Sequence, residues 1–146
     1  MCLSFKKSDL KDFSDFFGSK IKAIMIVHKD GVPMAELISK KLPQNDPTLI
    51  AGALTSICHV IEEITGKGIT SIATGDDYIH FLRTPYFNVV IMINERYAPI
   101  EPYLKIFEKR IISEYKEYLD NFDGEIGVID LKKILKDSLG ISFAIL

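Results

Sequence analysis

The stretch from Pro47 to Thr65 constrains the fold more than any other part of this 146-residue sequence. Apolar residues recur in it at the i, i+3, i+4 and i+7 spacing of an α-helix. Asp46 precedes it as an N-cap residue, Pro47 occupies the first helical position, and Gly66 follows as a left-handed C-cap. We therefore predict a helix over 47–65 whose main apolar stripe consists of Ile50, Ala53, Leu54, Ile57, Ile61 and Ile64.

The apolar surface of this helix is wider than one neighbouring sheet requires. Leu49, Cys58 and Val60 add apolar positions outside the main stripe. A stripe about 100° wide is enough to cover one face of a sheet. We therefore expect the helix to have a second partner, and one candidate is another copy of the same helix.

Five segments rich in β-branched and apolar residues predict strands, and they fall into two groups. The first group is a hairpin of Ile21–His28 and Val32–Ile38, joined by the turn residues Lys29-Asp30-Gly31. The second group is a three-strand meander over 69–73, 78–82 and 87–93. Because the connections within each group are short, neighbouring strands should be antiparallel. The continuous apolar run FNVVIMI at 87–93 is typical of a central strand that is covered on both faces.

Three further helices are predicted, over 8–17, 100–119 and 131–139. The whole chain, 1–146, is expected to form a single α+β domain with a core over 21–124. Residues 1–20 would then be an N-terminal helical extension and 125–146 a C-terminal one. The final apolar segment, ISFAIL, either packs back on the domain or docks on a partner. We favour packing back, because an exposed apolar terminus is a liability.

Composition and charge argue against nucleic acid and membrane partners. The net charge is −2 and the pI is near 5.9, so no bulk attraction to nucleic acid or anionic lipid is expected. The longest uninterrupted apolar runs are much shorter than the roughly 20 residues that span a bilayer, and the N-terminus lacks a signal-type apolar segment. We expect a cytoplasmic protein without direct membrane insertion.

Few residues in the sequence point to catalysis. The nearest approach to a phosphate-binding loop, TGKGIT at 65–70, lacks the first glycine of that motif and follows a helix rather than a strand. His28, His59 and His80 have no metal-ligand spacing, and Cys58 lies among apolar helical neighbours, which favours a packed thiol. We expect no enzyme activity, no cofactor and no metal.

Arg96 is the one arginine at a predicted strand-to-helix junction. An arginine there is a candidate for partner contact, or for stabilising charge at a bound nucleotide. A solvated loop charge is the more common explanation for such a residue.

The order of elements from Ile21 to Gly124 resembles the roadblock/longin superfamily over roughly three-quarters of the chain. Small archaeal longin-like proteins look most similar. The resemblance implies a five-stranded antiparallel sheet of order 2-1-5-4-3, flanked by helices in a profilin-like architecture of two to three layers. It rests on the turn Asp30-Gly31-x-Pro33, the helix start Asp46-Pro47, the Gly66–Gly68 return and the ending Phe122-Asp123-Gly124.

The resemblance also implies pairing through the central helix and the neighbouring edge strand. Such a dimer, with an identical chain or a related domain, continues the sheet across two subunits and covers an edge strand. The interface residues implied in this chain are Leu49, Ala53, Ile57, Val60, Ile61, Ile69, Ser71 and Ala73.

By the same resemblance, we expect a non-catalytic scaffold that binds or regulates a small Ras-like GTPase in trafficking or signalling. A GTPase partner of this kind would also provide recruitment to membranes. The alternative is a small-molecule-sensing module of profilin- or PAS-like type, with a pocket between sheet and helix. That alternative requires polar groups that converge inside the core, and the candidates are His28, Tyr78, His80 and Tyr103.

Overall fold

The computed structural model describes residues 21–38, 46–68, 70–93 and 101–139. The helix expected over 8–17, the predicted site residues Ile69 and Arg96, and the segment 141–146 lie outside these residues. In chain order the elements are β1 (Ile21–His28), β2 (Pro33–Ile38), α2 (Pro47–Thr65), β3 (Ser71–Thr74), β4 (Asp77–Arg83), β5 (Phe87–Ile93), α3 (Glu101–Asp120) and α4 (Leu131–Leu139).

The five strands form one antiparallel sheet of order β2-β1-β5-β4-β3, which confirms the predicted topology. The apolar strand β5 pairs with β1 on one side and with β4 on the other. The short strands β2 and β3 lie at the two edges. The hairpin between β1 and β2 turns at Gly31, whose φ of 93° is strained for any residue with a side chain.

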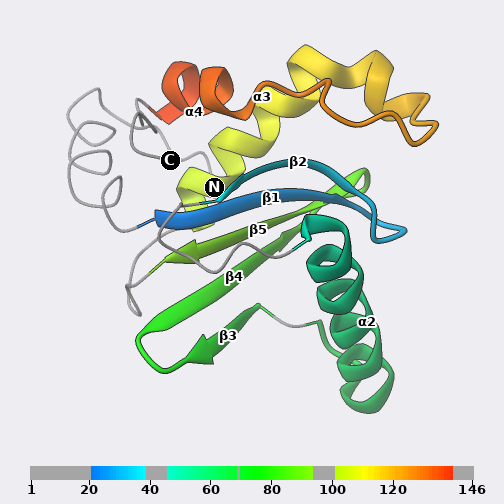
Figure 1. Ribbon diagram of the computed structural model, residues 1–146, viewed down its shortest axis with the longest axis vertical. Helices are drawn as coiled ribbons and strands as arrows, with labels where there is room; N and C mark the ends of the chain where they lie inside the picture. Colours follow the sequence, from blue (N-terminus) through cyan, green and yellow to red (C-terminus); the bar gives the residue numbers. More distant parts are fainter. Residues whose placement is uncertain (1–20, 39–45, 69, 94–100, 140–146) are drawn as a thin grey trace.

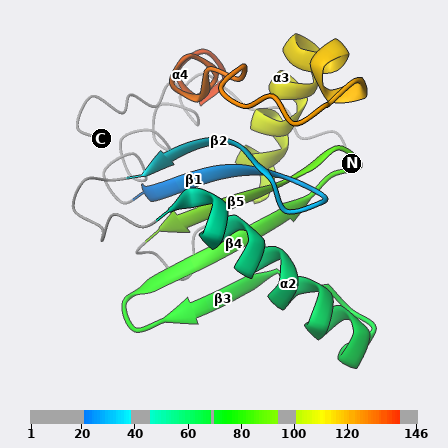
Figure 2. The same cartoon turned by 45° about the vertical axis from the view of Figure 1, so that its right-hand side comes forward.

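The sheet lies between two helical layers, so the domain has three layers (Figures 1 and 2). Helices α3 and α4 cover one face over β1, β2 and β5, and α2 crosses the other face. The two sides are unequal. The described buried core on the α2 side consists of Met25, Val27, Ala51 and Val90, whereas the cluster on the α3 side is several times larger.

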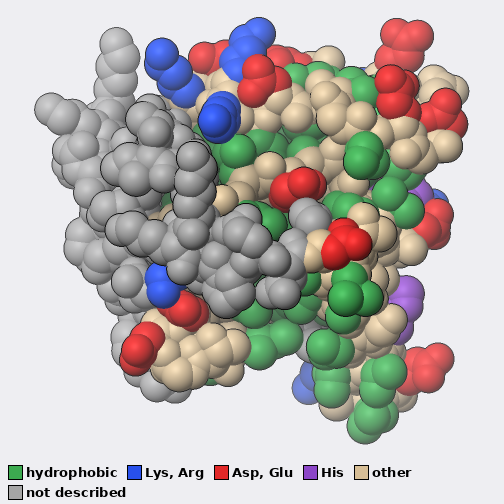
Figure 3. Space-filling view, in the orientation of Figure 1, with side chains coloured by type: hydrophobic (Ala, Val, Ile, Leu, Met, Phe, Trp, Pro, Cys, Tyr) green, Lys and Arg blue, Asp and Glu red, His purple; other side chains and the backbone are tan. Residues whose placement is uncertain are grey.

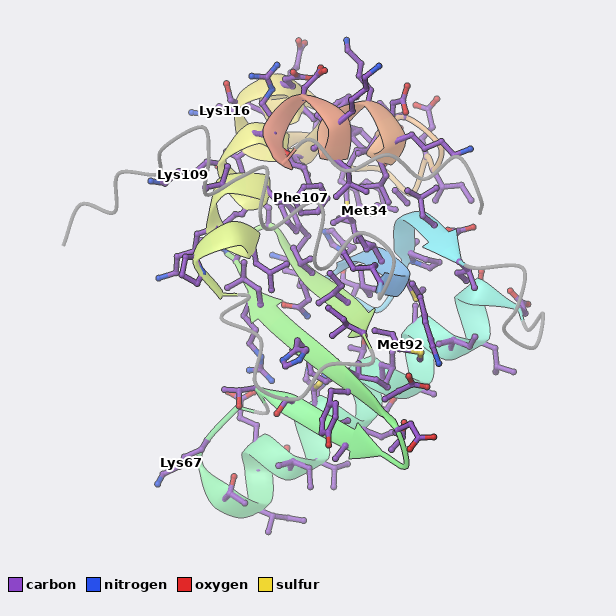
Figure 4. All side chains as sticks on the ribbon, turned by 90° about the vertical axis from the view of Figure 1, so that its left-hand side faces the viewer. Met34, Lys67, Met92, Phe107, Lys109 and Lys116 are labelled. Carbon is purple, nitrogen blue, oxygen red and sulfur yellow. The ribbon has the colours of Figure 1, made fainter. Side chains whose placement is uncertain are left out.

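The larger core joins the C-terminal helix to the sheet. Phe107 of α3 and Met34 of β2 lie in the layer between helices and sheet, and both are almost completely buried (Figure 4). Ile134 and Leu135 of α4 are buried in the same cluster. The larger hydrophobic cluster therefore includes α4.

Helix α3 is kinked, although the sequence pattern predicts one uninterrupted apolar face. Tyr115 has non-helical backbone angles, φ −120° and ψ 24°. Its hydroxyl accepts a hydrogen bond of 3.1 Å from the backbone N–H of Asp130, just before α4. The contact ties the kink to the start of the following helix.

The predicted ends of α2 are confirmed in detail. The Asp46 side chain accepts a 2.9 Å hydrogen bond from the backbone N–H of Thr48, and Pro47 occupies the first turn. Gly66 ends the helix with a φ of 71°, and its N–H donates to the carbonyl of Glu62.

The main apolar stripe of α2 is divided between the sheet and the solvent. Ile50 and Leu54 do pack against the sheet, but the residues buried there are Ala51 and Cys58, and Ala53 is exposed. Ile57, Ile61 and Ile64 are also exposed. The physical reason is that small residues on the inner side let the helix approach the sheet closely. Hydropathy alone favours the side with more isoleucine.

An ion pair fixes the C-terminal half of α2 to β4. Nη1 of Arg83 lies 2.6 Å from Oε2 of Glu62. The hydrogen bond from Arg83, together with its positive charge, lowers the pKa of the Glu62 carboxyl below its ordinary value of 4.5. The Cys58 side chain is buried one turn earlier on the same helix, which confirms it as a packed thiol.

Truncating α4 in the core should destabilise the domain strongly. We expect Ile134→Ala, at a side chain with no exposed surface, to lower the free energy of unfolding by about 2–5 kcal/mol. The exposed neighbour is the control, and Lys133→Ala should stay within about 0.5 kcal/mol. Urea denaturation measures both. Equal effects would contradict a core that includes α4.

Removing the arginine should return the pKa of Glu62 towards 4.5. A lowered pKa in the folded state means that the pair stabilises the fold above about pH 4.5 and loses its effect as the pH falls through the folded pKa. Carboxyl NMR titration of Arg83→Gln should therefore show a higher Glu62 pKa than in the unmutated chain. Arg110→Gln, which removes the partner of Glu114 on α3, should leave the Glu62 pKa unchanged.

Candidate functional site: an apolar surface on α2

The outer side of α2 carries an apolar stripe that the rest of the described structure leaves exposed. Figure 3 shows hydrophobic side chains gathered over this helix. Leu49 and Ile64 keep 71% and 74% of their surface exposed, and Val60 keeps 53%. The name outer stripe is used below for Leu49, Ala53, Ile57, Val60, Ile61 and Ile64.

Five of the six outer-stripe residues are the predicted interface residues of this helix, and the structure brings them onto one side. The sixth, Ile64, belongs to the main apolar stripe predicted from sequence but was not among the predicted interface residues. The polar residues Ser56, His59 and Glu63 lie on the neighbouring side of the helix, because each residue turns the helix by about 100°. The charge of Glu62 is directed inward by Arg83. The outer stripe itself therefore contains no charged residue.

An apolar surface of this kind has an energetic consequence. Contiguous exposed apolar side chains usually mark an interaction site, whereas single ones need no explanation. Burying one of these half-exposed Leu, Ile or Val side chains yields on the order of 1 kcal/mol. Five such side chains in a stripe can therefore drive association with another surface.

By length and composition alone, Thr48–Thr65 is apolar enough to cross a membrane, with a mean hydropathy of 1.2. The sequence analysis, based on uninterrupted apolar runs, did not anticipate this. A helix whose inner side packs on a sheet and whose outer side binds a second protein reaches the same hydropathy, since both sides are apolar.

Among the described residues, the edge strand β3 has a neighbouring strand on one side only. The N–H of Phe81 donates to the carbonyl of Thr70 over 3.0 Å, which sets the alternation of inward and outward backbone groups along β3. Ser71 and Ala73, both predicted interface residues, therefore direct their N–H and C=O groups away from β4.

The side chains of Ser71 and Ala73 do not join the outer stripe. They pair with His80 and Tyr78, on the sheet face opposite α2. Ile72 pairs with Ile79, which packs on the α2 side, so Ile72 shares the face of the helix. The sequence analysis omitted Ile72, although its alternation with Ser71 and Ala73 contained the necessary signal.

The polar groups required by the alternative, a ligand pocket, do not converge in the described part of the chain. The residues buried there include no polar or charged side chain. The ring of His28 lies 4.5 Å from that of Phe122, which follows α3. Tyr78 and His80 are only half-buried on β4, and the side chain of Tyr103 lies outside the described residues.

Comparisons with known proteins identify the fold. No protein-family model matches the chain, and no curated protein matches it. Among solved structures, a Roadblock/LC7 domain from Streptomyces avermitilis is similar with a TM-score of 0.51 at 9% identity, covering 81% of this chain and 100% of that one. Myxococcus xanthus MglB is similar with a TM-score of 0.50 at 12% identity, covering 80% and 96%.

Both similar chains match almost over their full lengths, and both share the arrangement that the sequence motifs predicted. At 9% and 12% identity, this similarity is evidence about the fold alone. The chain has a roadblock/longin-like fold.

Proposed function

We propose that this protein is a non-catalytic dimeric scaffold that binds or regulates a small Ras-like GTPase. The observation that carries the proposal is the outer stripe of α2, an uncharged apolar surface on the same side of the domain as the open edge of β3. The roadblock/longin-like fold supports it, because the resemblance implies platforms of this kind.

Self-association is the first part of the proposal. Two copies related by a two-fold axis would place one outer stripe against the other and would bring the two β3 edges together. The outward backbone groups of Ser71 and Ala73 would then pair with those of the second copy. Such pairing would remove an exposed edge strand as well as an exposed apolar surface. A related domain with the same features is the other candidate for the second subunit.

Binding of a GTPase is the second part. A scaffold needs a rigid surface rather than a reactive site, and the rigid sheet with its two helical layers supplies one. The cytoplasm is the location that suits such a scaffold, with recruitment to membranes through the GTPase. Arg96, at the junction between β5 and α3, remains the candidate for direct partner contact.

A charge placed in the outer stripe should separate the subunits. Ile57→Asp removes an apolar contact from both copies and introduces two carboxylates that the dimer would have to desolvate. We expect the dissociation constant to rise at least about a hundredfold, measured by sedimentation velocity over a dilution series.

The control for this test places the same acid on the polar side of the helix. His59→Asp should keep the dissociation constant within a few-fold of the unmutated value. Circular dichroism should show that both variants stay folded, since both positions are exposed. Equal effects of the two variants would contradict an interface centred on the outer stripe.

The GTPase should bind in a nucleotide-dependent way. We expect at least one Ras-like GTPase from the same genome to bind the dimer with about micromolar affinity when loaded with a non-hydrolysable GTP analogue, and more weakly with GDP. Isothermal calorimetry measures this, and Arg96→Ala tests the predicted contact. Nucleotide hydrolysis by the scaffold alone, or no binding by any such GTPase, would contradict the proposal.

A further inference from the structure

A groove lies where the chain turns back from α3 towards α4, and none of the contacts proposed above uses it. Its walls are the C-terminal end of α3 and the segment 121–130, called the return segment below. The groove has a volume of about 550 Å³. Pockets for small ligands have volumes of roughly 300–1,000 Å³, so this groove has room for a few side chains of a partner.

Negative charge is the most distinctive property of this groove. The described residues that line it include four carboxylates and no basic side chain. These carboxylates belong to Glu114, Glu117, Asp123 and Glu125. The chain from 114 to 130 contains six acidic residues and one lysine, whereas the whole chain has a net charge of only −2. Figure 3 shows acidic side chains gathered at this end of the molecule. The groove therefore favours a cationic occupant.

The dipole of α3 adds to this negative potential. The C-terminal end of a helix carries a partial negative charge, so lysine and arginine are the favourable residues there. The last turn of α3 instead contains Glu117 and Asp120 and no basic residue. These side chains repel the carbonyl groups at the end of the helix. A cation bound in the groove would relieve that repulsion.

The groove also presents aromatic and apolar surface. Tyr115 and Tyr118 line it from α3, and Val128, which keeps 37% of its surface exposed, lines it from the return segment. Lysine and arginine side chains combine an aliphatic stem with a charged end group, and they contact aromatic rings favourably. This combination of surfaces therefore suits basic side chains better than an inorganic cation.

Two hydrogen bonds link the walls of the groove. The hydroxyl of Tyr115 accepts from the backbone N–H of Asp130 over 3.1 Å, and the hydroxyl of Tyr118 donates to the backbone carbonyl of Glu125. Burial, together with the charges of Glu125 and Asp123, raises the pKa of the Tyr118 hydroxyl above its ordinary value of 10, so this hydroxyl stays protonated. Because the walls are already linked, a partner would not have to order them on binding.

The carboxylates are distributed over both walls and do not gather at one point. Within the described ranges, no group of three or more histidine, cysteine or acidic side chains could hold a metal ion. Nε of Arg110 lies 2.7 Å from Oε1 of Glu114, so that carboxylate is already paired. Glu117 on α3, with Asp123 and Glu125 on the return segment, supplies the remaining charge. Several cationic side chains on one segment of chain can contact both walls, whereas one small cation cannot.

We propose that this acidic groove is a docking site for a lysine- or arginine-rich segment of a partner protein. The cationic end groups contact Glu117, Asp123 and Glu125, and the aliphatic stems pack on the two tyrosines and Val128. The groove belongs to the helical layer opposite α2, so it and the outer stripe can be occupied at the same time. This inference does not depend on the proposed dimer or on a GTPase.

Binding of a short basic peptide to the full chain tests the proposal. The probe is a fluorescent peptide in which arginine alternates with serine, and fluorescence anisotropy at about 0.1 M salt measures its dissociation constant. The double variant Glu117→Gln, Glu125→Gln should raise this constant about tenfold or more, because charge-assisted contacts on both walls are lost.

The control variant removes the same charge from other exposed positions. Glu36→Gln combined with Glu63→Gln changes β2 and α2 instead of the groove. Because salt screens charges that lie far from the peptide, this variant should change the dissociation constant by less than about twofold. Equal weakening by the two double variants would reduce the effect to bulk charge and would overturn the proposal.

Amide chemical shifts measured by NMR should locate the bound peptide. We expect the largest changes within residues 114–128. Free arginine, at the same concentration of guanidinium groups, should bind much more weakly than the peptide, because a single cation does not contact both walls. The proposal would be overturned by shifts centred on the outer stripe, by equally tight binding of free arginine, or by no binding of the peptide.

Discussion

The two-sided apolar character of α2 is the constraint on which the rest of the structure depends. A single sheet face can bury one side of a helix. In α2 the buried side includes the small residues Ala51 and Cys58. The larger aliphatic side chains therefore remain outside. The described core beneath α2 is small. The contact between helix and sheet therefore orients the outer stripe but does not bury it. An exposed apolar stripe of this kind is typical of an interaction site.

The two edges of the sheet complement this arrangement. In an antiparallel sheet of order β2-β1-β5-β4-β3, the first and last strands each expose a row of backbone groups. The β3 edge lies with α2, and the β2 edge lies with α4. The larger core beneath α3 and α4 supplies the rigidity that keeps both edges in place. The proposed partner would cover the edge at β3.

Much of the fold was predictable because its signals are local. Asp46, Pro47 and Gly66 determine the ends of α2 through capping, and Gly31 determines the first hairpin. These features depend on neighbouring residues, so they can be recognised from sequence. The ladder of five strands follows from short connections and, for its order, from resemblance to a known fold.

The remaining features depend on contacts between distant residues. Hydropathy could not distinguish the sheet side of α2 from its outer side, because both sides are apolar. The kink lies at Tyr115, which also accepts a hydrogen bond from Asp130, and the ion pair of Glu62 joins α2 to β4. Ile72 was missed because the strand was predicted from propensity without deciding which face its side chains share with α2. The pocket alternative lost support for a similar reason, since convergence of polar groups is a three-dimensional property.

The most direct test of the account is the mass of the unmutated protein in solution. Sedimentation equilibrium at micromolar concentration should give twice the 16.5 kDa of one chain, because the outer stripe and the β3 edge are expected to be buried against a second copy. A mass of one chain at every concentration would contradict self-association through α2.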